Sequence, residues 1–147
     1  MIKRRLPLGI QNFEELRTGN YLYVDKTDMA WEIANGDKYN FLSRPRRFGK
    51  SLLTSTLQCY FEGKKELFEG LKIMDLEKDW VKRPVIHFSM NLGGSDAETL
   101  KSYLSKSLTN YETVYGKEDS EKSLSDRFTG IIQRAYQQAG VQIAVLI

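Results

Sequence analysis

A glycine, a lysine and a serine follow one another at Gly49, Lys50 and Ser51, at the end of a stretch rich in arginine. Residues 44–51 have the spacing of a phosphate-binding loop, in which a glycine and four variable residues precede glycine, lysine and serine or threonine. In such a loop, successive backbone N–H groups and the amides at a helix N-terminus cradle phosphate groups. Arg44 replaces the first glycine of the pattern, whereas its last three positions are intact.

Each residue type in this loop has a distinct task in nucleotide chemistry. A glycine lets the backbone pass close to a phosphate, a lysine reaches the β- and γ-phosphates as a point charge, and a serine hydroxyl holds Mg²⁺. We therefore predict that a nucleotide is the ligand and that Ser51 holds Mg²⁺, while the catalytic residues stay unassigned. The predicted nucleotide-binding residues are Arg46, Arg47, Phe48, Gly49, Lys50, Ser51 and Leu52.

Two other interpretations of the loop stay open. It could be a solvated basic turn that binds nothing, or a module that contacts nucleic acid or a protein partner without turning over nucleotide. Aromatic residues alternate with cations over residues 39–48, a pattern that can hold single-stranded nucleic acid. Tyr39 and Phe41, however, alternate within a predicted strand, and we expect both side chains to pack in the core.

The elements around the loop must bring it to the start of a helix. Residues 39–43 form an apolar, aromatic run that predicts a short strand. After the loop, apolar residues recur at helical spacing and predict one buried helix face, formed by Leu53, Leu57, Tyr60 and Phe61. The order strand, loop, helix is the context in which this motif binds phosphate.

The rest of the N-terminal half predicts short elements. Asn12 lies three positions before Glu15 and favours a helix that ends at Gly19, and residues 21–24 predict a brief strand. Thr27 or Asp28 can cap a second helix, for which Gly36 offers a left-handed stop. Residues 62–83 predict short helices or turns.

The C-terminal half alternates strands with long helices. Residues 85–90 predict a strand, the capping box Ser95 to Glu98 begins a helix with an apolar series through Tyr111, and residues 141–147 predict a buried strand. A second helix is predicted over 121–139 and closed by Gly140. Its apolar stripe is Leu124, Phe128, Ile131, Ile132, Ala135 and Tyr136. This alternation predicts an α/β fold with a mainly parallel sheet flanked by helices.

Composition limits the class of protein. The chain has 147 residues, 41% of them hydrophobic, with a net charge of +3 and one cysteine, Cys59. These values predict one compact globular unit without an internal disulfide. The absence of an apolar leader or a long apolar run predicts a cytoplasmic protein with no membrane span.

Four runs of the sequence carry a family resemblance: residues 6–13, 23–27, 41–53 and 60–63. Together they resemble the bacterial AAA-ATPase-like family, in which an arginine at the first loop position is usual. The resemblance implies an incomplete P-loop NTPase fold, with residues 1–37 as an N-terminal extension and 38–147 as the P-loop core. It also implies a predicted cytosolic ATPase, often joined to a C-terminal domain that resembles PD-(D/E)XK nucleases.

The same resemblance predicts that the chain is an N-terminal fragment. In the family, the strand corresponding to residues 141–147 runs into an Asp-Glu pair that assists Mg²⁺ and polarises water. Without that pair, we expect the fragment to bind ATP without hydrolysing it. Exposed sheet edges favour self-association, and nucleic acid is the expected partner of the absent nuclease-like domain.

Three further sites carry residues capable of chemistry. Asp25, Lys26 and Thr27 belong to the family-like pattern, and they either cap the next helix or lie beside the nucleotide. His87 is the only histidine and lies in a predicted strand, which favours a structural role. Cys59 lies near the core face of its helix and is expected to be a buried hydrophobic residue.

Overall fold

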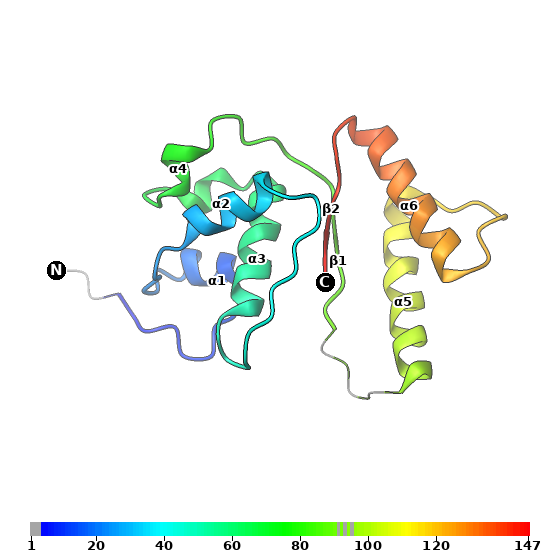
Figure 1. Ribbon diagram of the computed structural model, residues 1–147, viewed down its shortest axis with the longest axis horizontal. Coiled ribbons are helices and arrows are strands. Elements are labelled where there is room, and N and C mark those ends of the chain that lie inside the picture. The colour runs from blue at the N-terminus through cyan, green and yellow to red at the C-terminus, as the bar shows by residue number, and fades with distance from the viewer. Residues whose placement is uncertain (1–3, 91, 93, 95) are drawn as a thin grey trace. The chain divides into compact units, whose positions relative to one another are not determined.

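The computed structural model describes residues 4–90, 92, 94 and 96–147. The chain divides into two compact units, residues 1–82 and 83–147, where the sequence predicts one. The first unit holds α1 (Phe13–Thr18), α2 (Thr27–Asn35), α3 (Lys50–Phe61), the 3₁₀ helix η1 (Lys65–Phe68) and α4 (Ile73–Leu76). The second holds β1 (Val85–His87), α5 (Ala97–Tyr115), α6 (Leu124–Ala139) and β2 (Ala144–Leu146) (Figure 1).

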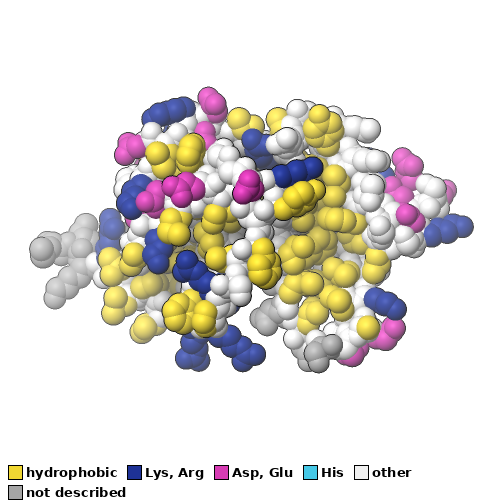
Figure 2. Space-filling view, in the orientation of Figure 1, with side chains coloured by type: hydrophobic (Ala, Val, Ile, Leu, Met, Phe, Trp, Pro, Cys, Tyr) yellow, Lys and Arg dark blue, Asp and Glu magenta, His cyan; other side chains and the backbone are white. Residues whose placement is uncertain are grey.

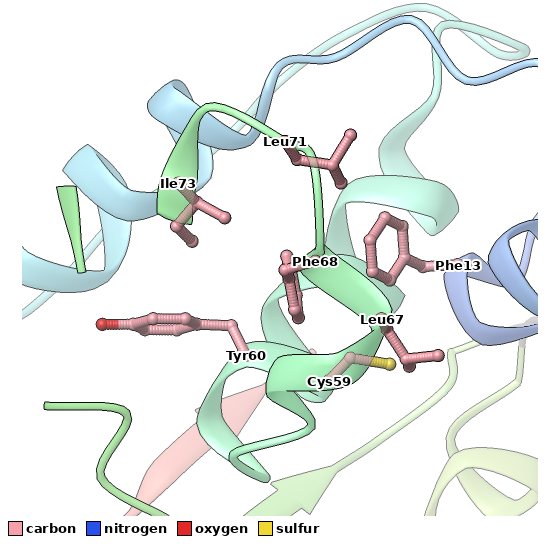
Figure 3. Packing of buried hydrophobic residues seen from close by; sticks show 7 residues of the cluster. All are labelled: Phe13, Cys59, Tyr60, Leu67, Phe68, Leu71 and Ile73. Carbon is pink, nitrogen blue, oxygen red and sulfur yellow. The ribbon is translucent and has the colours of Figure 1, made fainter. Parts of the chain in front are cut away.

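The first unit is held together by an aromatic and aliphatic core between α1, α3 and η1. The rings of Phe13 and Phe68 lie 4.8 Å apart between centroids, and both side chains are fully buried (Figure 3). The Trp80 ring also packs against Phe68, with 5.2 Å between the ring centroids. The remaining buried members of this cluster are Cys59, Tyr60, Leu67, Leu71 and Ile73.

The predicted helices of this unit form, and their ends explain why. The Asn12 side chain accepts a hydrogen bond from the Glu15 amide at 3.0 Å, and α1 ends at Gly19 as predicted. Helix α3 follows the loop as predicted, and Leu57 and Tyr60 of its predicted apolar face are buried. The short helices η1 and α4 confirm the prediction for residues 62–83.

Two predicted strands of this unit are absent. Residues 39–43 have no regular structure, and Tyr39 and Phe41 are 83% and 93% exposed rather than packed in the core. Residues 21–24 contribute only a single bridge, between Arg5 and Tyr21. A strand needs a neighbour to pair its backbone groups, and no described residue pairs with residues 39–43.

Helix α2 begins and ends differently from the prediction. Its N-cap residue is Lys26, so neither Thr27 nor Asp28 is the cap. Gly36 follows the helix with φ −85°, so the chain leaves α2 without a left-handed residue.

The second unit combines a parallel strand pair with two long helices. Strands β1 and β2 are parallel, with Val85 opposite Ala144. Ile86, Phe88, Leu108 and Ile131 form its buried core. The parallel direction is confirmed, although both strands are shorter than predicted and the sheet has only two strands among the described residues. The described chain thus combines helices with a small parallel sheet, which agrees with the predicted α/β class.

The ends of α5 and α6 show which capping predictions hold. Ser95 lies outside the described residues, and the structure shows Asp96 as the N-cap of α5, with its side chain accepting from the Thr99 amide at 2.8 Å. Helix α6 starts three residues later than predicted, after a capping box between Ser123 and Asp126. Gly140 ends α6 in the left-handed conformation, as predicted.

The prediction that Tyr136 belongs to the buried apolar stripe of α6 is wrong. Tyr136 is 54% exposed, while Ile131 and Ala135 are fully buried. Arg127, one helical turn before Ile131 on the same face of α6, is buried as well. This arginine lies against α5.

Arg127 joins α6 to α5 through a nearly buried ion pair. Its guanidinium donates to both carboxylate oxygens of Glu112, at 2.6 and 3.0 Å. It also donates to the Ser105 hydroxyl at 2.8 Å and to the Thr109 hydroxyl at 2.9 Å. The side chains of Arg127 and Glu112 are 10% and 8% exposed. The pair therefore has the additional hydrogen bonds that a buried charge requires.

Candidate functional site

The predicted phosphate loop turns sharply just before α3. Gly49 has φ 78° and ψ 17°, and α3 begins at the next residue. A Cβ atom at this position would meet nothing within 4 Å, so the positive φ rather than a lack of space favours glycine. Arg47 also has a positive φ, 66°. Left-handed residues in a turn help to direct successive N–H groups toward an anion.

The first turn of α3 presents backbone amides without a side-chain cap. No side chain in the described part of the chain caps this helix, whereas Leu53 donates to the Gly49 carbonyl at 2.9 Å and starts the helical ladder. Amides of a first turn have no partner within the helix. The start of α3 therefore offers donors to an anionic ligand, and the predicted position of Gly49 at this start is confirmed.

Lys50 folds back across the loop. Its Nζ atom donates to the carbonyl oxygens of Arg44 and Pro45, at 2.5 and 2.9 Å. These contacts place the ammonium group within the ring formed by residues 44–50. The side chain predicted to meet the β- and γ-phosphates is thus held by the loop itself.

The loop is exposed and positively charged. Residues 38–50 carry five cations and no carboxylate, and the three arginines at 44, 46 and 47 are exposed. Ser51 is exposed at the second position of α3, and Leu52 beside it is half-buried. The structure thus gathers the predicted residues 46–52 in one turn and its helix. A turn with this charge attracts negatively charged ligands.

Beside the loop lies a cavity that sequence analysis misses. It measures about 420 Å³, and Arg44, Phe48 and Gly49 of the loop form part of its wall. Its other lining residues come from residues 6–7, 16, 22–42 and the first two turns of α3, so no local pattern in the sequence marks it. On the face drawn in Figure 2, hydrophobic and basic side chains gather over the region of α1 and the loop before α3.

Asp25 and Thr27 join α2 to α4. Asp25 accepts from the Thr27 amide at 2.9 Å, from the Thr27 hydroxyl at 2.7 Å and from the Lys72 amide at 2.8 Å. The Thr27 hydroxyl in turn accepts from the Ile73 amide at 3.1 Å. Burial raises the pKa of Asp25, but the hydrogen bonds from Thr27 and Lys72 outweigh it and leave a lowered pKa. These contacts favour the structural interpretation of Asp25, whereas Lys26 lines the cavity.

Replacing Asp25 with alanine is expected to destabilise the protein without affecting the ATP binding predicted from the sequence. The variant leaves the buried Thr27 hydroxyl and the Lys72 amide short of an acceptor, at a cost of about 1–3 kcal/mol. Urea unfolding followed by tryptophan fluorescence measures the loss, since Trp31 and Trp80 both lie in this unit. A variant of unchanged stability that binds ATP more weakly would instead place Asp25 beside the nucleotide.

The contacts of the single histidine and the single cysteine indicate structural roles. His87 lies in β1, and its backbone amide donates to the Tyr111 hydroxyl at 2.8 Å. Cys59 is buried in the core of the first unit, and this burial raises the pKa of its thiol to about 11. A thiol with so high a pKa is a poor nucleophile at neutral pH, in line with the prediction for Cys59.

The described residues show neither a metal-binding cluster nor a membrane-spanning helix. Within residues 4–90, 92, 94 and 96–147, no group of three or more His, Cys, Asp or Glu side chains is placed to hold a metal ion. None of the helices in that part of the chain combines the length and the apolarity that crossing a membrane requires.

Comparison with known proteins adds family membership to this geometry. A protein of Azotobacter chroococcum mcd 1, described as an uncharacterized protein in the vnfD 5' region, is 39% identical over 150 residues. The alignment covers 100% of this chain and 29% of that relative, so the chain spans less than a third of its length. No solved structure matches the chain. The sequence model of the family described as "Predicted AAA-ATPase" matches residues 7–147, and the chain therefore belongs to this family.

Proposed function

We propose that residues 44–51 form a P-loop that binds the phosphates of ATP. The observation that carries this proposal is the left-handed Gly49 at the uncapped start of α3, with the Lys50 ammonium held over the loop. Membership of a predicted ATPase family supports it independently. The proposal extends to the fold, which we take to be an incomplete P-loop NTPase fold with its core in residues 38–147.

The residues present fit a Mg²⁺–nucleotide complex. The amides of Lys50, Ser51 and Leu52 lie at a helix N-terminus, where the partial positive charge favours phosphate. Arg46 and Arg47 add charge beside it. An exposed serine hydroxyl at the second helical position supplies the oxygen that Mg²⁺ prefers. Mg²⁺ would neutralise phosphate charge, and this chain's own contribution is to bind and orient the phosphates.

Hydrolysis needs a group that orients the attacking water as well as cations that stabilise charge. Residues 38–52 carry no carboxylate, so the loop supplies only the cations. We propose that this chain binds ATP without steady turnover. Turnover would require a longer protein, comparable in length to the Azotobacter relative. Calorimetric titration with ATP, with and without Mg²⁺, tests the binding, and phosphate release tests the turnover. Absence of ATP binding in both titrations would refute the proposed function.

Replacing Ser51 with alanine is expected to remove the magnesium dependence of ATP binding. The variant loses the hydroxyl proposed to hold Mg²⁺ but keeps the amide at this position and the Lys50 charge. Calorimetry should therefore give similar affinities with Mg²⁺ and with EDTA, whereas the unchanged protein binds ATP more tightly with Mg²⁺. Ser55 to alanine, one helical turn further along α3, is the control and should keep the magnesium dependence.

A nucleic-acid-binding module is the second candidate, and one observation favours it. Tyr39, Phe41 and Phe48 are 83%, 93% and 63% exposed within the basic segment 38–50, where bases could stack on them. This candidate predicts binding of single-stranded DNA that weakens steeply with salt and is indifferent to ATP. The P-loop is the correct assignment if the protein binds ATP, loses this binding when the Lys50 charge is removed, and shows no salt-dependent affinity for single-stranded DNA.

A further inference from the structure

We infer that the Tyr111 hydroxyl closes the free edge of β1, so that a second copy of this chain can add a strand to the sheet only at β2. The sheet has two strands among the described residues, and each strand therefore has one side without a neighbouring strand. Such an edge presents N–H and C=O groups with which the strand of another chain can pair. The two edges of this sheet differ in what they offer to such a strand.

The free side of β1 is identified by the direction of its backbone groups. The Pro84 carbonyl and the Phe88 amide both bond to β2, at 3.0 and 2.8 Å. In a parallel ladder, alternate residues of a strand direct their N–H and C=O groups to the neighbouring strand. The amide and the carbonyl of His87 consequently point away from β2, along the free edge.

One side chain of α5 occupies this edge. The Tyr111 hydroxyl accepts a hydrogen bond from the His87 amide at 2.8 Å and donates to the His87 carbonyl at 3.3 Å. A residue on an antiparallel neighbouring strand would make the same two bonds with its own carbonyl and amide. A hydroxyl can replace both groups, since it is at once a donor and an acceptor. Tyr111 thus takes the place of the residue through which another strand would pair.

The surroundings of Tyr111 indicate that its hydroxyl is the part that blocks the edge. Its ring packs edge-on against the buried Phe88, with 6.3 Å between the ring centroids, and this contact holds the side chain at β1. A cavity of about 310 Å³ lies beside it, between His87 and residues of α5. The edge at His87 therefore borders open space. A phenylalanine could make the same ring contact but would leave the backbone groups of His87 available.

The outer edge of β2 favours pairing with another strand. The Ala144 amide bonds to Pro84, so Val145 directs its backbone groups outward. Residues 141–147 contain no charged side chain that would repel a neighbour. An antiparallel copy centred on Val145 would place Ile143 opposite Ile147, so that apolar residues meet along the pair. The partner that fits this edge is therefore β2 of a second copy.

The number of open edges determines how far association can proceed. One open edge on each copy limits association to a closed dimer, whereas two open edges allow a chain of copies to grow. We expect the unchanged protein to reach a dimer at most. Tyr111→Phe should free the edge of β1 and give species whose average mass keeps rising with protein concentration. Sedimentation velocity over a series of concentrations measures this shift.

Tyr103→Phe is the matched control for the loss of a hydroxyl. Tyr103 lies about two turns before Tyr111 on α5 and packs against the same core, and its variant should sediment like the unchanged protein. Circular dichroism checks that each variant is folded. A folded Tyr111→Phe variant that associates no further than the unchanged protein would overturn the inference.

A proline at the edge separates exposure of the edge from loss of stability. His87→Pro removes the outward amide, and proline is tolerated in an edge strand where the amide faces away from the sheet. Added to Tyr111→Phe, it should abolish the growth of large species, although it restores no lost contact. Growth that persists in the folded double variant would show that lowered stability rather than the free edge is the cause, and would equally refute the inference.

Hydrogen exchange provides a test without any substitution. The Val85 amide also points away from β2, because the carbonyl of the same peptide group, at Pro84, bonds to β2. Nuclear magnetic resonance of the unchanged protein should show that the His87 amide exchanges about tenfold more slowly than the Val85 amide, since the Tyr111 hydroxyl accepts from His87 alone of the two. Equal exchange rates would exclude the proposed role of Tyr111, whether or not the variants fold.

Discussion

Replacing Lys50 with alanine is expected to weaken ATP binding roughly 10- to 150-fold, which corresponds to the loss of a charged hydrogen bond of about 1.5–3 kcal/mol. The Lys50 side chain already reaches across the loop, to the carbonyl oxygens of Arg44 and Pro45. Entry of a phosphate would exchange these neutral acceptors for charged ones. Isothermal titration calorimetry with Mg²⁺–ATP measures the effect.

Two controls separate the phosphate contact from general charge. Lys38 to alanine removes an exposed lysine from the same basic segment and should change ATP affinity much less, because charges that stay in solvent are screened. Arg44 to glycine restores the first glycine of the motif, and should leave ATP binding unchanged or improve it if the arginine side chain makes no phosphate contact. Equal ATP affinity in the unchanged protein and the Lys50 variant would contradict the P-loop assignment.

Replacing Glu112 with alanine is expected to lower the free energy of unfolding of the second unit by about 3–5 kcal/mol. The substitution leaves the Arg127 guanidinium nearly buried, with only Ser105 and Thr109 as partners. An uncompensated buried charge is among the costliest single defects in a protein. Urea unfolding followed by far-ultraviolet circular dichroism measures the loss, because α5 and α6 are the longest helices described.

The exposed pair Glu98 and Lys101 provides the matched control on the same helix. Their side chains are 86% and 65% exposed, so Glu98 to alanine should leave the unfolding curve unchanged. Replacing Glu112 with leucine and Arg127 with methionine together should recover most of the lost stability, because both charges are then removed. A Glu112 variant as stable as the unchanged protein would show that the ion pair adds nothing.

The same ion pair gives unfolding a defined dependence on pH. The hydrogen bonds from Arg127 lower the pKa of Glu112 below its ordinary value of 4.5. The carboxylate therefore contributes its stability at pH values above 4.5. This contribution is lost as the pH falls from that value through the lowered pKa of the folded state. The Glu112 to alanine variant should lose less stability than the unchanged protein over this acidic range.

Helices were the predictable part of this fold, because their signals are local. Asn12 and Gly140 mark helix ends through hydrogen bonds or dihedral angles within a few residues. The apolar spacing of α3 and α6 reveals their buried faces in the same way. Arg127 shows the limit of this reasoning. From the sequence, a charged residue beside an apolar stripe is expected to face solvent. Only the structure shows that Arg127 has a partner, Glu112, on another helix.

Strands were less predictable, because a strand depends on its neighbour. Residues 85–90 and 141–147 contain strands that pair with each other, whereas residues 39–43 have the same kind of sequence and no partner among the described residues. Composition cannot distinguish these cases. Tyr39 and Phe41 are consequently the largest misassignment, buried in the prediction and exposed in the structure.

The candidate site was predictable only where it is continuous in sequence. Gly49, Lys50 and Ser51 follow one another, so their position at the start of α3 could be predicted from the motif and the helical spacing. The cavity draws its wall from residues between Leu6 and Thr56. No spacing rule connects such distant positions, and the tertiary structure alone brings them together.

The pairing of β1 with β2 has a consequence for the order of folding. In the sequence, the two strands lie at opposite ends of the second unit. Their pairing must therefore close a loop that contains all of α5 and α6. Loop closure is entropically costly, and contacts distant in sequence form slowly. The contact of α5 with α6 joins segments much closer in the chain, such as Ser105 and Arg127, and its formation shortens the effective loop between the strands. The pair of helices α5 and α6 is therefore expected to nucleate this unit, with the parallel strands pairing last.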